Sequence, residues 1–222
     1  MAGISNCRRN SFALLRGADI LLRNGHFPAA LSLAVLALEE IGKMMHIDSL
    51  VFAKAGDERD AAFQAAFRSH PKKLEAINGF PYFLAYLATF KPKWAEDNVY
   101  VQQLRSVEIA FREQLTNVMK LLGLRSLSDF DGWKQRGFYT SLNPNGVTEG
   151  PSDAIDDAKA RPVVAFSGLV VESMDWIFEL NFERYKAFVL QARGVVSDEK
   201  LLEIRRFLQD WLMIDAKNSN QT

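Results

Sequence analysis

Residues 27–46 read FPAALSLAVLALEEIGKMMH, and this stretch decides the fold. Nearly every residue from 29 to 38 is apolar, so a helix here has no polar side to turn towards water and must lie at the centre of the molecule. Pro28 suits the first turn of such a helix, where a missing N–H costs nothing. The pattern predicts a central helix over about residues 27–54.

Amphipathic segments on both sides of this helix predict an all-α protein, a helical bundle. The other helices are expected over residues 11–23, 58–68, 71–87, 97–122, 153–192 and 198–216. Asn24-Gly25 ends the first of them, and Pro71 opens the third. Pro81 and Pro162 are expected to kink or break the helices that contain them. The bundle is expected to be a single domain over residues 1–216, followed by a disordered tail, KNSNQT, at 217–222.

Residues 124–152 interrupt the helical pattern. Aromatic side chains alternate there with glycine, asparagine, aspartate and proline. This composition is typical of turns, so we expect an ordered loop or a small hairpin that turns at residues 143–150. The bundle therefore carries an irregular aromatic insertion.

Bulk composition narrows the classes of function. The chain has 222 residues with 27 basic and 27 acidic side chains, which argues against a protein that coats nucleic acid through net charge. Its single cysteine, Cys7, allows no internal disulfide and fits a reducing, cytoplasmic setting. The N-terminus lacks the apolar run of a signal peptide. The apolar region 163–180 carries three acidic residues, so we expect a core helix rather than a membrane span.

The end of the central helix carries an unexpected polar cluster. Glu39, Lys43 and His46 fall on one face at helical spacing, with Glu40 about a quarter-turn from Glu39. Spacing alone favours a Glu39–Lys43 ion pair where the helix leaves the core. Buried carboxylates, however, must be paired, which also fits a functional site. Gly42 costs roughly 1 kcal/mol against alanine, so it is expected to permit close contact with another backbone or a ligand.

A metal site is a rival explanation for this cluster. Helical di-iron proteins use Glu-x-x-His on paired helices. Here the residue three beyond Glu40 is Lys43, and neither His26 nor His70 completes such a motif. We therefore expect no metal and no other cofactor.

A second polar stretch, RSHPKKL, occupies residues 68–74. It places His70 among Arg68, Lys72 and Lys73. One interpretation is a solvated junction between helices. The other is a phosphate site, in which the cations hold a phosphodiester and the imidazole moves a proton.

Both stretches together, in this order and spacing, resemble the AbiV family of bacterial abortive-infection proteins. The resemblance spans residues 10–175. The matching segments are GHFPAALSLA at 25–34, EEIGK at 39–43, HPKKL at 70–74 and WKQRGFY at 133–139, with Ala18, Leu21 and Leu22 before them.

The resemblance implies a HEPN-like α-helical domain. Many HEPN proteins are dimers, and many are metal-independent ribonucleases whose signature is arginine, four to six residues, then histidine. This chain departs from that signature, because Arg68 and His70 are separated by one residue. The resemblance also implies a role in stopping phage growth by shutting down translation, with a phage protein as activating partner.

Two hypotheses follow. In the first, a homodimer cleaves RNA: His70 is the general acid or base, Lys43, Lys72 or Lys73 stabilises the phosphorane, and Glu40 orients a cation. In this hypothesis Glu39 and Arg68 join the two lysines of the junction in binding the substrate. In the second, the protein binds a phage protein or the translation machinery without catalysis. The polar clusters are then structural, and the aromatic insertion either supplies contact surface or forms a small core under a loop.

Overall fold

The computed structural model describes residues 2–52, 60, 63–64, 67–89, 98–139, 141–142 and 148–175. All of them belong to the first of the chain's two compact units, Met1–Trp176. The predicted helix over 198–216, the tail and the domain boundary at 216 lie outside the described residues. So do residues 176–192 of the helix predicted over 153–192 and most of the predicted helix over 58–68. Those features remain predictions.

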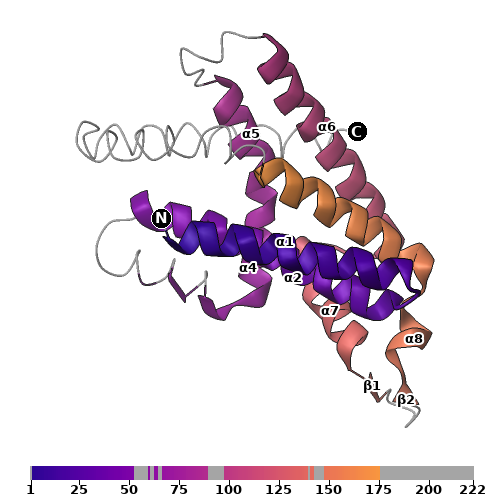
Figure 1. Ribbon diagram of the computed structural model, residues 1–222. Helices are drawn as coiled ribbons and strands as arrows, with labels where there is room; N and C mark the ends of the chain where they lie inside the picture. Colours follow the sequence, from indigo (N-terminus) through magenta and orange to yellow (C-terminus); the bar gives the residue numbers. More distant parts are fainter. Residues whose placement is uncertain are drawn as a thin grey trace. The chain divides into compact units, whose positions relative to one another are not determined.

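The described part is an all-α domain, which confirms the predicted fold class (Figure 1). Its helices are α1 (Ala2–Arg23), α2 (Phe27–Phe52), α4 (His70–Ala76), η1 (Ile77–Gly79), α5 (Phe80–Thr89), α6 (Asn98–Leu122), η2 (Leu127–Asp129), α7 (Phe130–Phe138) and α8 (Pro151–Ala154), followed by a helix over residues 157–175. Two short strands, β1 (Ser141–Leu142) and β2 (Thr148–Glu149), pair antiparallel. None of the described helices is long and apolar enough to cross a membrane.

α1 and α2 pack against each other as a helical hairpin (Figure 1). Gly25 ends α1 with a φ of 79°. The amide of His26 bonds to the carbonyl of Leu21 at 2.9 Å, and the amide of Gly25 bonds to that of Leu22 at 3.2 Å. These bonds satisfy the last carbonyls of the helix. The predicted stop at Asn24-Gly25 is therefore confirmed.

α2 is the central helix, as its composition predicts. It contacts α1, α4, α7 and α8. Its fully buried apolar side chains are Ala30, Leu31, Ala34, Val35, Ala37, Leu38, Ile41 and Met44. Because small alanines lie between the larger residues, neighbouring helices can approach α2 closely.

Four buried phenylalanines connect the remaining helices. Phe111 of α6 lies 5.2 Å from Phe80 of α5 and 5.4 Å from Phe166 of the helix over 157–175, measured between ring centroids. Phe166 stacks in turn on Phe130 of α7 at 6.4 Å. The rings therefore form one continuous core between helices that are far apart in sequence.

Of the two proline predictions, one is confirmed and one is wrong. The helix opened by Pro71 divides at η1, immediately before Pro81, which stands as the second residue of α5, where proline is tolerated. Pro162 breaks nothing, because the helix over 157–175 runs through it; the interruption lies at residues 155–156. The first helix also begins earlier than expected, at Ala2 rather than at Ser11.

The segment 124–152 is more regular than its composition indicates. Of the two predicted forms, a hairpin is present: β1 and β2 pair with Ser141 opposite Glu149 and Leu142 opposite Thr148. The turn predicted over 143–150 was too long, because Thr148 and Glu149 belong to β2, and residues 143–147 lie outside the described residues. The sequence pattern missed α7, which contains the aromatic and glycine residues taken for a loop. Gly132 and Gly137 lower the helix propensity of this segment, so its sequence was interpreted as a loop.

Candidate functional site

The central feature of the site is a contact between α2 and α4. Glu39 of α2 has a side chain only 4% exposed, and its Oε2 lies 2.5 Å from Nδ1 of His70. The carboxylate accepts, so Nδ1 carries the proton. The His70 side chain is 52% exposed, and its ring has no other partner among the described residues. The contact therefore fixes the imidazole and leaves Nε2 as the nitrogen with a lone pair.

A third helix holds the other side of the carboxylate. Nζ of Lys134, on α7, lies 2.5 Å from Oε1 of Glu39 and 2.6 Å from Oδ1 of Asp131. Burial alone would lower the pKa of Lys134, but hydrogen bonds and charge attraction from Asp131 and Glu39 outweigh burial and raise it. The ammonium is thus a fixed positive charge that joins two carboxylates.

Gly42 brings α4 close enough for this contact. A Cβ at Gly42 would lie 1.7 Å from the carbonyl oxygen of Lys73, so only glycine allows the two backbones to touch here. One turn further along α2, Nε2 of His46 donates to the carbonyl of Lys72 at 3.0 Å. Ser69 caps the start of α4 by accepting from the amide of Lys72. The expected close approach at Gly42 is confirmed.

Gly137 likewise allows α7 to approach α2 closely. A Cβ at Gly137 would lie 2.0 Å from Oγ of Ser32 and 2.5 Å from the carbonyl oxygen of Pro28. The Ser32 hydroxyl is 2.9 Å from the carbonyl of Lys134 and 3.0 Å from that of Pro28. α7 therefore docks on the first half of α2, α4 docks on the second half, and Glu39 lies between them.

Glu40 and Lys43 form a separate pair. Nζ of Lys43 lies 3.3 Å from Oε1 of Glu40 and 5.6 Å above the ring of Phe67. The Glu39–Lys43 pair that helical spacing favours is not formed, because Glu39 turns towards His70 and Lys134 instead. Glu40 faces α1, where its charge and hydrogen bond add to burial in raising the pKa of Cys7 to about 11.

The cations around His70 differ in exposure. Arg68 and Lys72 are exposed and remain candidates for binding an anion. Lys73 is only 8% exposed, and its charge acts on the buried Cys7. Lys73 and Glu39, both predicted to bind substrate, therefore occupy positions better suited to holding the helices together and orienting His70.

One group of side chains could also hold a cation. Single ligand atoms of Glu39, His70 and Asp131 lie within 4.8 Å of one another. Imidazole with carboxylate oxygens is a donor set that suits zinc and similar divalent ions. The ammonium of Lys134 already stands between the two carboxylates, so a metal ion would have to displace it. Our expectation of a metal-independent site remains a prediction.

Asp131 and Lys134 were not predicted as site residues. Lys134 is separated from Glu39 by 95 positions in the chain, so no local spacing could pair them. The one local signal was the Asp131–Lys134 spacing, which places opposite charges on the same side of a helix. That signal required a helix in a segment expected to be irregular.

A protein-family model identifies the family of this chain. The family model HEPN_AbiV, described as AbiV, matches residues 1–172. The chain belongs to the AbiV family. No curated protein and no solved structure matches it. AbiV-family membership makes it an abortive-infection protein of the defence class, with an α-helical HEPN domain. The polar contacts of Glu39 all lie within the residues that the AbiV model covers.

Proposed function

We propose that this AbiV-family protein is an anti-phage effector that cleaves RNA, with His70 as the group that transfers the proton. The Glu39–His70 contact at 2.5 Å carries the proposal. A buried carboxylate on Nδ1 of an exposed histidine selects the tautomer with a basic Nε2, the arrangement that general-base catalysis requires.

The reaction needs no external reagent. Nε2 of His70 takes the proton from a ribose 2′-OH, whose oxygen attacks the adjacent phosphorus while the bond to the 5′ oxygen breaks. The products are a 2′,3′-cyclic phosphate and a strand with a 5′-OH, whose oxygen accepts a proton from a general acid. The exposed cations Arg68 and Lys72 are placed beside His70 in the chain to bind the phosphate. Lys43, oriented by Glu40, is a further cation for the phosphorane.

A homodimer would supply a second copy of this histidine. Each chain offers one exposed imidazole held by a carboxylate among its described residues, whereas the cleavage uses both a base and an acid. Two copies facing one groove would meet both needs. We expect a phage-encoded protein to switch on the activity by favouring that assembly, and the loss of RNA to stop translation in the infected cell.

The test is incubation of purified protein with total cellular RNA and with tRNA, in EDTA and in magnesium. Wild-type protein should produce discrete fragments ending in 2′,3′-cyclic phosphate under both conditions. His70→Ala should abolish cleavage, Glu39→Gln should reduce it by about tenfold or more, and His26→Ala, an exposed histidine outside the site, should leave it unchanged. Cleavage by folded His70→Ala protein would refute the assignment. Cleavage only with a divalent ion would assign Glu39, His70 and Asp131 to a metal.

Exposed aromatic residues favour a second candidate, a non-catalytic interaction protein. At the end of α7, Phe138 is 43% and Tyr139 is 68% exposed, with ring centroids 6.4 Å apart. Aromatic side chains in solvent are common anchors of protein interfaces. If Phe138→Ser/Tyr139→Ser protein loses phage protection while no preparation cleaves RNA, this candidate replaces the first.

A further inference from the structure

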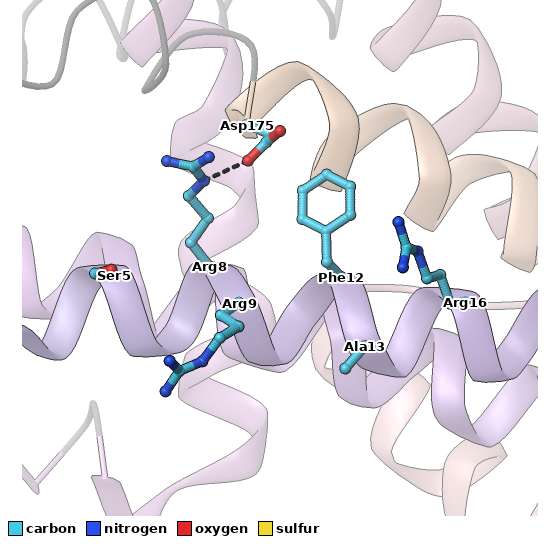
Figure 2. Close-up of a pocket in the computed structure, with 7 residues that line it drawn as sticks. All are labelled: Ser5, Arg8, Arg9, Phe12, Ala13, Arg16 and Asp175. Atoms are coloured by element: carbon cyan, nitrogen blue, oxygen red, sulfur yellow. Dashed lines mark hydrogen bonds and ion pairs between the residues drawn. The ribbon is translucent and has the colours of Figure 1, made fainter.

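A hollow lies along the outer side of α1, away from the contacts of Glu39. Its volume is about 550 Å³, and its lining includes Arg8, Arg9, Phe12 and Arg16 of α1 with Asp175 of the helix over 157–175. Figure 2 shows Arg8, Phe12 and Arg16 extending towards that helix and Arg9 pointing the other way. The hollow is therefore formed by one aromatic ring with an arginine on either side.

The spacing of these three residues makes a row that is slightly inclined to the helix axis. They stand at positions i, i+4 and i+8 of α1, so each step along the axis is about 6 Å and the two arginines are about 12 Å apart. Phe12 is only partly covered. An aromatic ring beside cations is the combination that holds single-stranded nucleic acid, because the ring stacks on a base while the cations contact the backbone.

The charge of the hollow is strongly positive for a protein with no net charge. Three arginines and a single carboxylate line it, and that carboxylate pairs with Arg8. Arg9 points away and contacts the neutral amide of Asn6, whereas Arg16 has no hydrogen bond or ion pair within the described residues. Arg16 is therefore available to a phosphate, while Arg8 is held in place by Asp175.

We propose that this hollow binds single-stranded RNA. Phe12 stacks on a base, Arg16 contacts a flanking phosphate, and the Arg8–Asp175 pair keeps the other end of the row rigid. Stacking tolerates any base, so binding is independent of sequence. A duplex hides its base faces and cannot use the ring. The proposal deepens the proposed function by naming a surface that holds the substrate strand.

Fluorescence anisotropy with a short labelled single-stranded RNA tests this site. The full chain carries His70→Ala, so that the probe stays intact. Arg16→Gln should weaken binding about tenfold and reduce the slope of log affinity against log salt by about 0.7, the value for one phosphate contact on a single strand. Phe12→Leu should also weaken binding about tenfold but leave the salt slope unchanged, because stacking releases no counterions.

Arg161→Gln is the matched control, since it removes the same charge from an exposed position outside the hollow that pairs with Asp157. Melting curves must show that all variants fold. Equal losses for Arg16→Gln and Arg161→Gln would mean attraction by charge alone and would overturn the proposal. So would equal binding of duplex RNA, or binding of Phe12→Leu protein at wild-type affinity. If the RNA binds as described but wild-type protein cleaves nothing, only the proposed function fails.

Discussion

Replacing Gly42 by alanine tests how the candidate site is assembled. The added Cβ would lie 1.7 Å from the carbonyl oxygen of Lys73 and 2.6 Å from its carbonyl carbon. Ordinary van der Waals contact begins at 3.4 Å, so α4 must withdraw by about half of that distance. The obstacle is backbone, which cannot rotate aside as the end of a side chain can. The displacement therefore reaches the other contacts of α4.

The magnitude can be worked out from three effects. Overpacking costs about 1–3 kcal/mol. Losing the bond between Glu39 and the half-exposed His70 costs about 1.5 kcal/mol, the lower end for a charged hydrogen bond. Alanine recovers about 1 kcal/mol of helix propensity. The free energy of unfolding of Gly42→Ala should therefore fall by about 1.5–3.5 kcal/mol.

Urea unfolding followed by far-UV circular dichroism measures this change. Gly132→Ala is the control, because Gly132 also lies within a helix but its Cβ would meet nothing within 4 Å. That variant should gain about 0.5–1 kcal/mol. Hydrogen exchange should be faster at the amides of α4 in Gly42→Ala only. If Gly42→Ala is as stable as wild type and its α4 amides stay protected, the helices do not meet as described.

Three further predictions concern buried polar groups. Lys134→Met should lower the free energy of unfolding by about 3–5 kcal/mol, because Glu39 loses its buried partner. The raised pKa of Lys134 means that its contribution is complete below the ordinary 10.5 and is lost as pH rises through the higher folded value, so wild type should lose stability in alkali and Lys134→Met should not. Ser32→Ala should cost about 1 kcal/mol, against nearly nothing for the exposed Ser106→Ala, in the same urea assay. Cys7, buried and with its pKa raised to about 11, should react with iodoacetamide only when urea unfolds the chain; rapid labelling of native protein would contradict its burial.

Apolar patterning was enough to predict the fold class of the described residues and their central helix. A segment without a polar side can only be central, and a glycine inside it needs a close neighbour, so α2 and the approach at Gly42 were both predictable. Gly137 presented the same signal within α7, but its segment was interpreted as a loop. The difference is context, because Gly42 lies in a long apolar run whereas Gly137 follows Gly132 among polar residues.

The partners of the polar residues could not be predicted in the same way. Helical spacing predicts an ion pair between Lys43 and Glu39, yet Lys43 pairs with Glu40. A carboxylate at the junction of three helices is buried, and its charge must be balanced by whatever the other helices bring there. Those partners, His70 and Lys134, are distant in sequence, so the choice is made by tertiary packing.

The same reasoning bears on the arginine–histidine signature that this chain lacks. A sequence signature can reveal a cation and an imidazole of one site only when both belong to one short segment. Here the described residues place an imidazole on α4 and a buried ammonium on α7, joined through one carboxylate on α2. A fixed positive charge and an oriented histidine can thus share a site with no local motif. The missing signature is therefore compatible with catalysis, and Glu39→Gln, which removes the negative charge that joins the imidazole to the ammonium, tests whether their connection matters for it.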